Sequence, residues 1–207
     1  HLRQQTSLAQ LLLSIQNAAV RQGRPTTLPE NWPSYEPTTF AQQLTVPNQP
    51  MVDPKWPGEK PQVKATFNLN STHMGEQGGS EAQFLQAIKN ALRTWSVVET
   101  AEFTLLYQGA STATNTGLNS KSEILFLHRG LGGQLGQAQI WYTNSGVIVE
   151  ADLWINDDYL VDATGAPQAN EIDVESVALH ELGHWTPLGH VDAAEAVMYP
   201  VLGNGVR

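Results

Sequence analysis

Apolar residues recur at intervals of three to four positions in three segments of the chain, which predicts three helices. The first covers residues 6–22 and is followed by Gly23. The second begins after Ser80, a residue type that favours helix N-termini. Its apolar positions form one stripe, made of Phe84, Ile88, Leu92 and Trp95. The third begins near Asp173, which can cap it in the same way.

Five other segments show the pattern of β-strands, which is either alternation of apolar and polar residues or a short apolar run. The first of them covers residues 63–69. The other four lie between the second and third predicted helices, at residues 102–108, 122–128, 137–143 and 147–155. The expected order is therefore strand, helix, four strands and helix.

The segment before the first strand has a different composition. Residues 25–61 contain nine of the twelve prolines, and such a stretch forms extended or irregular structure rather than a core. We therefore divide the chain into an N-terminal helix with a proline-rich extension, residues 1–54, and a folded domain, residues 55–207.

Composition excludes several classes of protein. The 207 residues include no cysteine, which excludes disulfides and thiolate zinc sites. The net charge of −9 argues against nucleic acid as a partner, and no apolar run is long enough to insert into a membrane. Many Gln, Asn and Thr residues beside few lysines favour a secreted protein. The oligomeric state has no signature in the sequence.

The most informative motif is His-Glu-Leu-Gly-His at residues 180–184, within the last predicted helix. His180 and His184 lie one turn apart on one helix face, as two ligands of the same Zn²⁺ must. Glu181 falls beside this face without being a ligand, where it can act as a general base. His190 can supply a third ligand if the chain folds back after the helix. Three protein ligands and a water indicate a catalytic rather than a structural zinc.

A second motif follows the third histidine. Met198, Tyr199 and Pro200 come eight to ten residues after His190. Together with the histidine motif, this spacing resembles that of the metzincin metallopeptidases, and of the matrixin branch in particular. The resemblance covers residues 55–202. It implies a zinc-dependent endopeptidase with one catalytic Zn²⁺, a protein or peptide substrate, a Met-turn at Met198, and a pocket wall that includes Tyr199 and Pro200.

The resemblance also implies an α+β fold, the metzincin-like zincin domain. Such a domain has a twisted, mostly parallel five-stranded sheet with an antiparallel edge strand, a backing helix and an active-site helix. The edge strand falls at residues 137–142, and an extended peptide would pair with it. Matrixins continue past the Met-turn into a further helix, but only residues 201–207 follow here, so we expect this C-terminal helix to be absent.

Pro187 departs from the family pattern, because metzincins carry glycine seven residues after the first histidine. Glycine allows positive φ at such a turn, whereas proline fixes φ near −65°. We expect Gly189 to take the left-handed conformation instead. If this turn fails, His190 does not reach the metal. The alternative is then a non-catalytic zinc-binding or adhesion module, and a zinc hydrolase with a non-peptide substrate is a third interpretation.

An acidic segment suggests a second cation. Asp157, Asp158 and Asp162 can hold Ca²⁺ through carboxylate oxygens, although a solvated acidic loop explains them equally well. We expect no second zinc. Trp154 stands where the resemblance places one of the ligands of such a site, and His128 has no evident partner.

Asp53 is a candidate for control of the site. It directly precedes the predicted domain, and relatives of the matrixins can block their zinc with a carboxylate. Glu30 and Glu36 are equally available for this role by sequence. This role requires residues 1–54 to be a propeptide. A plain accessory segment is the alternative.

Overall fold

The computed structural model describes residues 54–69, 77–98, 103–131 and 134–206. The predicted helix at residues 6–22 and the candidate blocking residue Asp53 lie outside these ranges, so both stay predictions.

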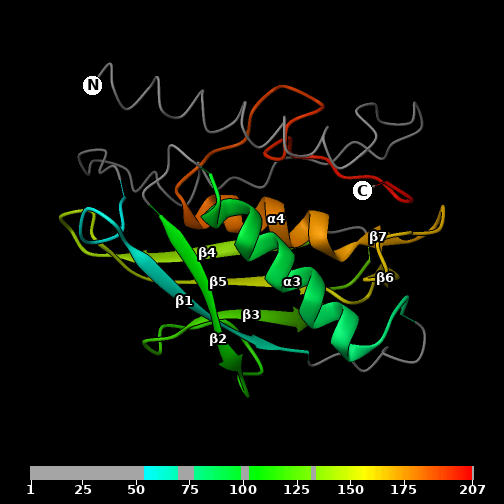
Figure 1. Cartoon of the computed structure of the whole chain (residues 1–207), viewed down its shortest axis with the longest axis horizontal. Coiled ribbons are helices and arrows are strands. Elements are labelled where there is room, and N and C mark those ends of the chain that lie inside the picture. Colours follow the sequence, from blue (N-terminus) through cyan, green and yellow to red (C-terminus); the bar gives the residue numbers. More distant parts are fainter. Residues whose placement is uncertain (1–53, 70–76, 99–102, 132–133, 207) are drawn as a thin grey trace.

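A five-stranded sheet forms the centre of the described domain (Figure 1). Its strands, in the spatial order β2-β1-β3-β5-β4, are β2 (Thr104–Ala110), β1 (Gln62–Asn68), β3 (Ser122–Leu127), β5 (Ile148–Asn156) and β4 (Gly136–Tyr142). The first four run parallel to their neighbours, and β4 pairs antiparallel with β5 at the edge. The predicted mostly parallel sheet with an antiparallel edge strand is therefore confirmed.

Two helices cover one face of this sheet. They are α3 (Glu81–Ser96), which packs on β2, and α4 (Val174–Trp185), which packs on β4 and β5. Both helices begin where their capping residues predict. The Ser80 hydroxyl accepts the N–H of Gln83, and the Gln83 side chain accepts the N–H of Ser80. Asp173 accepts the N–H of Ser176 at 2.8 Å.

The core lies between the helices and the sheet. The apolar stripe of α3 is buried there, and the ring of Phe84 meets that of Phe126 on β3 edge to face, with centroids 5.5 Å apart. Trp185, at the end of α4, is fully buried, and its indole N–H donates to the carbonyl of Asp152 on β5. These contacts fix the last turn of α4, where the zinc motif lies, against the sheet.

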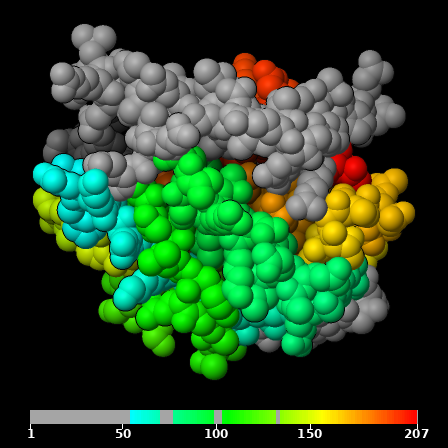
Figure 2. All heavy atoms as spheres, in the orientation of Figure 1, coloured from blue at the N-terminus to red at the C-terminus, as the bar shows by residue number. Residues whose placement is uncertain are grey.

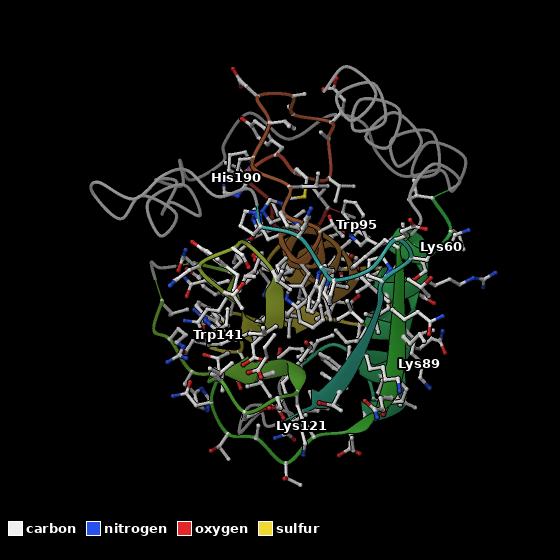
Figure 3. All side chains as sticks on the ribbon, turned by 90° about the vertical axis from the view of Figure 1, so that its left-hand side faces the viewer. Lys60, Lys89, Trp95, Lys121, Trp141 and His190 are labelled. Carbon is white, nitrogen blue, oxygen red and sulfur yellow. The ribbon has the colours of Figure 1, made fainter. Side chains whose placement is uncertain are left out.

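The face of the sheet away from the helices buries carboxylates. Glu150 accepts the backbone N–H groups of Asn119 and Lys121, and Asp152 accepts those of Gly117 and Glu123. Burial raises the pKa of Asp152 to about 7, and the nearby charge of Glu150 adds to this, while the two N–H donors act in the opposite direction. The loop that carries Lys121 therefore covers an acidic layer beneath the sheet, far from the zinc motif in Figure 3.

Two short strands, which the sequence pattern does not predict, lead into α4. They are β6 (Val161–Asp162) and β7 (Ile172–Asp173), which pair in parallel. The N–H of Gly78, just before α3, donates to the carbonyl of Val161 at 2.9 Å. This contact places the segment after β5, yellow in Figure 2, against the start of α3.

Residues 54–56, which we call the N-terminal strap, connect the edge of the sheet with α4. Lys55 donates its N–H to the carbonyl of Gly146 and accepts the N–H of Ile148, both at 2.8 Å. The indole N–H of Trp56 donates to the carbonyl of Trp185 at 2.7 Å. The strap therefore holds both the β4–β5 hairpin and the C-terminal end of α4.

Candidate metal centre

The three predicted histidines come together at one end of α4. His180 and His184 lie on the same helix face, with ring centroids 5.1 Å apart. His190 lies on the segment that follows the helix, and its centroid is 5.1 Å from that of His180 and 4.9 Å from that of His184. Figure 3 shows His190 beside α4, at the end of the molecule opposite Lys121. The chain thus folds back after α4 as the third-ligand hypothesis requires.

Two of the rings are held in one orientation by backbone carbonyls. Nδ1 of His180 lies 2.7 Å from the carbonyl oxygen of Val197, and Nδ1 of His184 lies 2.7 Å from that of Leu188. A carbonyl only accepts hydrogen bonds, so each Nδ1 carries the proton and each Nε2 keeps its lone pair. The same arrangement orients histidine ligands in metal sites.

The lone pairs converge on one point. Nε2 of His180 and Nε2 of His190 are 3.1 Å apart. Two ligands of a tetrahedral ion at 2.0–2.1 Å are about 3.4 Å apart, so this spacing is close to that of neighbouring zinc ligands. Nitrogen atoms so close repel each other unless a proton or a cation lies between them.

The imidazoles are also neutral. Burial lowers the pKa of His180 to about 3 and that of His184 to about 4. Burial also lowers the pKa of His190. A neutral imidazole is the form that binds a metal, so this donor set fits a Zn²⁺ ion with three protein ligands and an open position.

Glu181 is buried between α4 and the start of the edge strand β4. Burial raises its pKa to about 8, while the N–H of Ala138 acts in the opposite direction. A Cβ atom at Gly136 would lie 3.0 Å from both Cγ and Oε1 of Glu181. The absence of a side chain at Gly136 therefore lets the strand approach this carboxyl group closely.

Met198 packs against Gly183 of α4. It is fully buried, and its N-terminal neighbour Val197 supplies the carbonyl that orients His180. The carbonyl of Met198 accepts the N–H of Val191 at 3.0 Å, which closes the loop after His190. Tyr199 and Pro200 follow directly and are half-buried, and their role as a pocket wall stays a prediction.

The turn after α4 differs from the expected one. Pro187 itself has a positive φ of 27°, and Gly189 is not among the residues with positive φ. The expectation that Gly189 takes the left-handed conformation is therefore wrong. The N–H of Leu188 donates to the carbonyl of Gly183 at 3.2 Å, which is one of the two bonds of a Schellman turn. Residue 187 would donate the other bond, but proline has no N–H.

The three acidic residues assigned to calcium do not form one cluster. The carboxylate of Asp162 accepts the N–H groups of Thr164 and Gly165, each at 3.0 Å, in the turn after β6. Asp157 and Asp158 lie together, and His128 joins them. The expectation that His128 lacks a partner is therefore wrong, because its Nδ1 lies 2.9 Å from Oδ1 of Asp157.

The sequence reasoning missed two residues that shape the site, Gly136 and Trp56. Nothing in the local pattern marks either of them, because each acts on a segment far away in the chain. The partners of His128, in contrast, could have been predicted from the sequence. Residues 122–128 and 147–155 were both predicted as strands, and a parallel pairing of the two brings their C-terminal ends together.

The chain is similar to plant metalloendoproteinases. It is 32% identical to Metalloendoproteinase 1 of Glycine max over 127 residues, which is 60% of this chain and 40% of that protein. It is 50% identical to Metalloendoproteinase 2-MMP of Arabidopsis thaliana over 36 residues, which is 17% of this chain and 10% of that protein. The chain thus matches less than half the length of these relatives.

A solved structure gives a looser match. Metalloproteinase-II from Bacteroides fragilis is 16% identical and has a TM-score of 0.39, with 77% of this chain and 54% of that chain covered. Among the described residues, no helix has the length and apolar character needed to cross a membrane. Secretion stays a prediction.

The family match is broader than these pairwise similarities. The model of the Matrixin peptidase family matches residues 55–206, which contain the sheet, both described helices and all three histidines. This chain belongs to the matrixin family.

Proposed function

We propose that this protein is a zinc-dependent endopeptidase that cleaves extended protein or peptide substrates. The observation that carries the proposal is the position of Glu181. Its carboxyl group lies on the helix that carries His180 and His184 and against the edge strand β4. A general base, a metal-binding triad and a strand that can receive a peptide therefore meet at one place.

The histidine triad would hold Zn²⁺ through the Nε2 atoms of His180 and His184 and through the ring of His190. When bound, the ion supplies Lewis acidity, which activates a water and polarises the scissile carbonyl. The positive charge of the ion would favour the ionised form of Glu181, whose carboxylate would then take a proton from a water and donate it to the leaving amine. Its buried position favours the first step, because burial increases the affinity of the carboxylate for a proton.

The edge strand would orient the substrate. In the described sheet β4 pairs with β5 on one side only, so its other edge is available for an extended peptide. Main-chain hydrogen bonds to β4 would place the scissile bond beside Glu181. Tyr199 and Pro200 would line the pocket for the residue that follows the cut.

The test is hydrolysis of a mixed peptide library by the wild type and by Glu181→Gln, which keeps the size of the side chain but removes the base. We expect the variant to lose a factor of about 10² to 10⁴ in kcat with zinc still bound. Glu175→Gln is the matched control, because Glu175 is buried on the same helix but accepts a hydrogen bond from Asn90 on α3.

Glu175→Gln should keep wild-type activity. Equal turnover by the wild type and Glu181→Gln would contradict the mechanism. A wild type that binds zinc but cleaves no peptide would contradict the peptidase proposal and support the non-catalytic module.

A further inference from the structure

A second cluster of metal-ligating side chains lies at the C-terminal ends of β3 and β5 (Figure 1). These strands run parallel, and Leu127 pairs with Asn156, so the residues that follow them lie side by side. Nδ1 of His128 is 2.9 Å from Oδ1 of Asp157 and 3.4 Å from Oδ1 of Asp158. The three residues thus offer one nitrogen and two carboxylate oxygens within 4.8 Å of one another.

The distances fit neighbouring ligands of one ion. Two atoms that each lie about 2.1 Å from a metal are separated by about 3.0 Å along an octahedral edge and by about 3.4 Å along a tetrahedral edge. Both separations from the nitrogen of His128 lie close to these values.

The cluster also brings two carboxylates together. The side chain of Asp157 is fully buried, and that of Asp158 lies in the same cluster. The guanidinium of Arg129, the neighbour of His128 in sequence, is directed elsewhere. It lies 5.1 Å from the ring centroid of Trp154 and donates to the side chain of Asn115. A divalent ion would offset both carboxylates.

Two backbone N–H groups hold the carboxylate of Asp158 in one orientation. Oδ2 of Asp158 accepts the N–H groups of Gly130 and Arg129, at 2.5 and 2.6 Å, which leaves Oδ1 directed towards His128. Asn156 adds support, because its Oδ1 accepts the N–H of Asp158 at 3.1 Å. Ligating carboxylates in metal sites are hydrogen-bonded in this way.

We propose that His128, Asp157 and Asp158 form a binding site for a divalent transition-metal ion of the Zn²⁺ or Co²⁺ type, separate from the histidine triad. The imidazole nitrogen favours these ions over Ca²⁺, which takes oxygen ligands. The side chains of His128 and Asp158 are 43% and 21% exposed, so water completes the coordination and the ion has a path of entry. The site does not depend on the proposed peptidase activity.

A bound ion would stabilise the position of residues that precede the edge strand β4. The side-chain amide of Asn156 donates to the carbonyls of Gly130 and Gln134, at 2.9 and 3.1 Å. These residues precede β4, which packs on Glu181. The ion would therefore join the ends of β3 and β5 to the start of the strand that borders the active site.

The experiment measures bound zinc per full chain by mass spectrometry after equilibrium dialysis against buffered free Zn²⁺. We expect two ions in the wild type and one in His128→Ala and in Asp157→Asn, with the affinity for the second ion lowered at least 10-fold. Asp162→Asn is the matched control, because Asp162 is equally buried but lies in the turn after β6, and it should keep two ions. Far-ultraviolet circular dichroism verifies that each variant is folded.

If Asp157→Asn does not fold, the test rests on His128→Ala, which should fold because the side chain of His128 is exposed. The same number of ions in the wild type and His128→Ala would overturn the proposal. One ion in the wild type and none in His128→Ala would support this site and instead count against the triad.

Discussion

Gly183 shows how closely single atoms are fitted around the metal centre. A Cβ atom at this position would lie 2.2 Å from Sδ of Met198 and 2.8 Å from Cζ2 of Trp95. Both neighbouring side chains are buried, so neither can move into open space. The glycine between the two α4 histidines is therefore needed for packing, in addition to its place in the zinc motif.

We predict that Gly183→Ala destabilises the protein although alanine favours helices. Overpacking a core costs about 1–3 kcal/mol, which exceeds the gain of about 1 kcal/mol in helix propensity. Urea denaturation measures the change in the free energy of unfolding. The double variant Gly183→Ala/Met198→Ala should lose less stability than the sum of the single variants, because Met198→Ala removes the clash. Strict additivity would show that the two residues do not compete for space.

At the scale of elements, the start of α4 is determined by local sequence, whereas its end is determined by tertiary structure. The start follows from Asp173, whose side chain caps the helix as its residue type predicts. The end does not follow from local rules. Proline disfavours positive φ, yet residue 187 has a φ of 27° in the turn between α4 and His190. The tertiary contacts of the loop outweigh the local preference.

Pro187→Gly should therefore stabilise the protein. Glycine adopts positive φ without strain and restores the missing N–H of the turn, which together exceed its larger entropy in the unfolded state. We expect a net gain of about 1 kcal/mol, since backbone strain of this kind costs about 1–3 kcal/mol. Calorimetry measures the rise in Tm. Gly189→Ala is the control, because its Cβ meets no atom within 4 Å and Gly189 has no positive φ. A fall in Tm for Pro187→Gly would contradict this account of the turn.

Much of the architecture was predictable because it rests on short-range pattern. The stripe on α3, its Ser80 cap and the five main strands all follow from residue spacing. Contacts between distant segments do not follow from residue spacing alone. The cluster of His128 with Asp157 needs the register of β3 against β5, and the contact of Gly136 with Glu181 needs the packing of α4 on β4.

For the whole molecule, the acidic layer beneath the sheet sets a dependence of stability on pH. The pKa of Asp152 is raised by burial from 3.8 to about 7, so the folded protein keeps this proton over a range in which the unfolded chain releases it. The unfolded state then binds fewer protons, and stability falls as pH rises between about 4 and 7. Above this range the contribution of Asp152 is constant.

Asp152→Asn tests this contribution because asparagine cannot titrate. The free energy of unfolding, measured by urea denaturation from pH 5 to pH 7, should fall less steeply for the variant than for the wild type. The comparison of slopes is independent of any constant cost of the substitution. Identical slopes would show that the pKa of Asp152 is not raised in the folded state.

The N-terminal strap has a consequence for proteolytic processing of the chain. Lys55 holds the β4–β5 hairpin and Trp56 holds the last carbonyl of α4, so two neighbouring residues join the hairpin to the helix that carries His180 and His184. A cut that removes the chain up to residue 53 leaves both hydrogen-bonded connections intact. A cut only three residues further along severs both at once. The permissible start of an active fragment is therefore confined to the residues before Lys55.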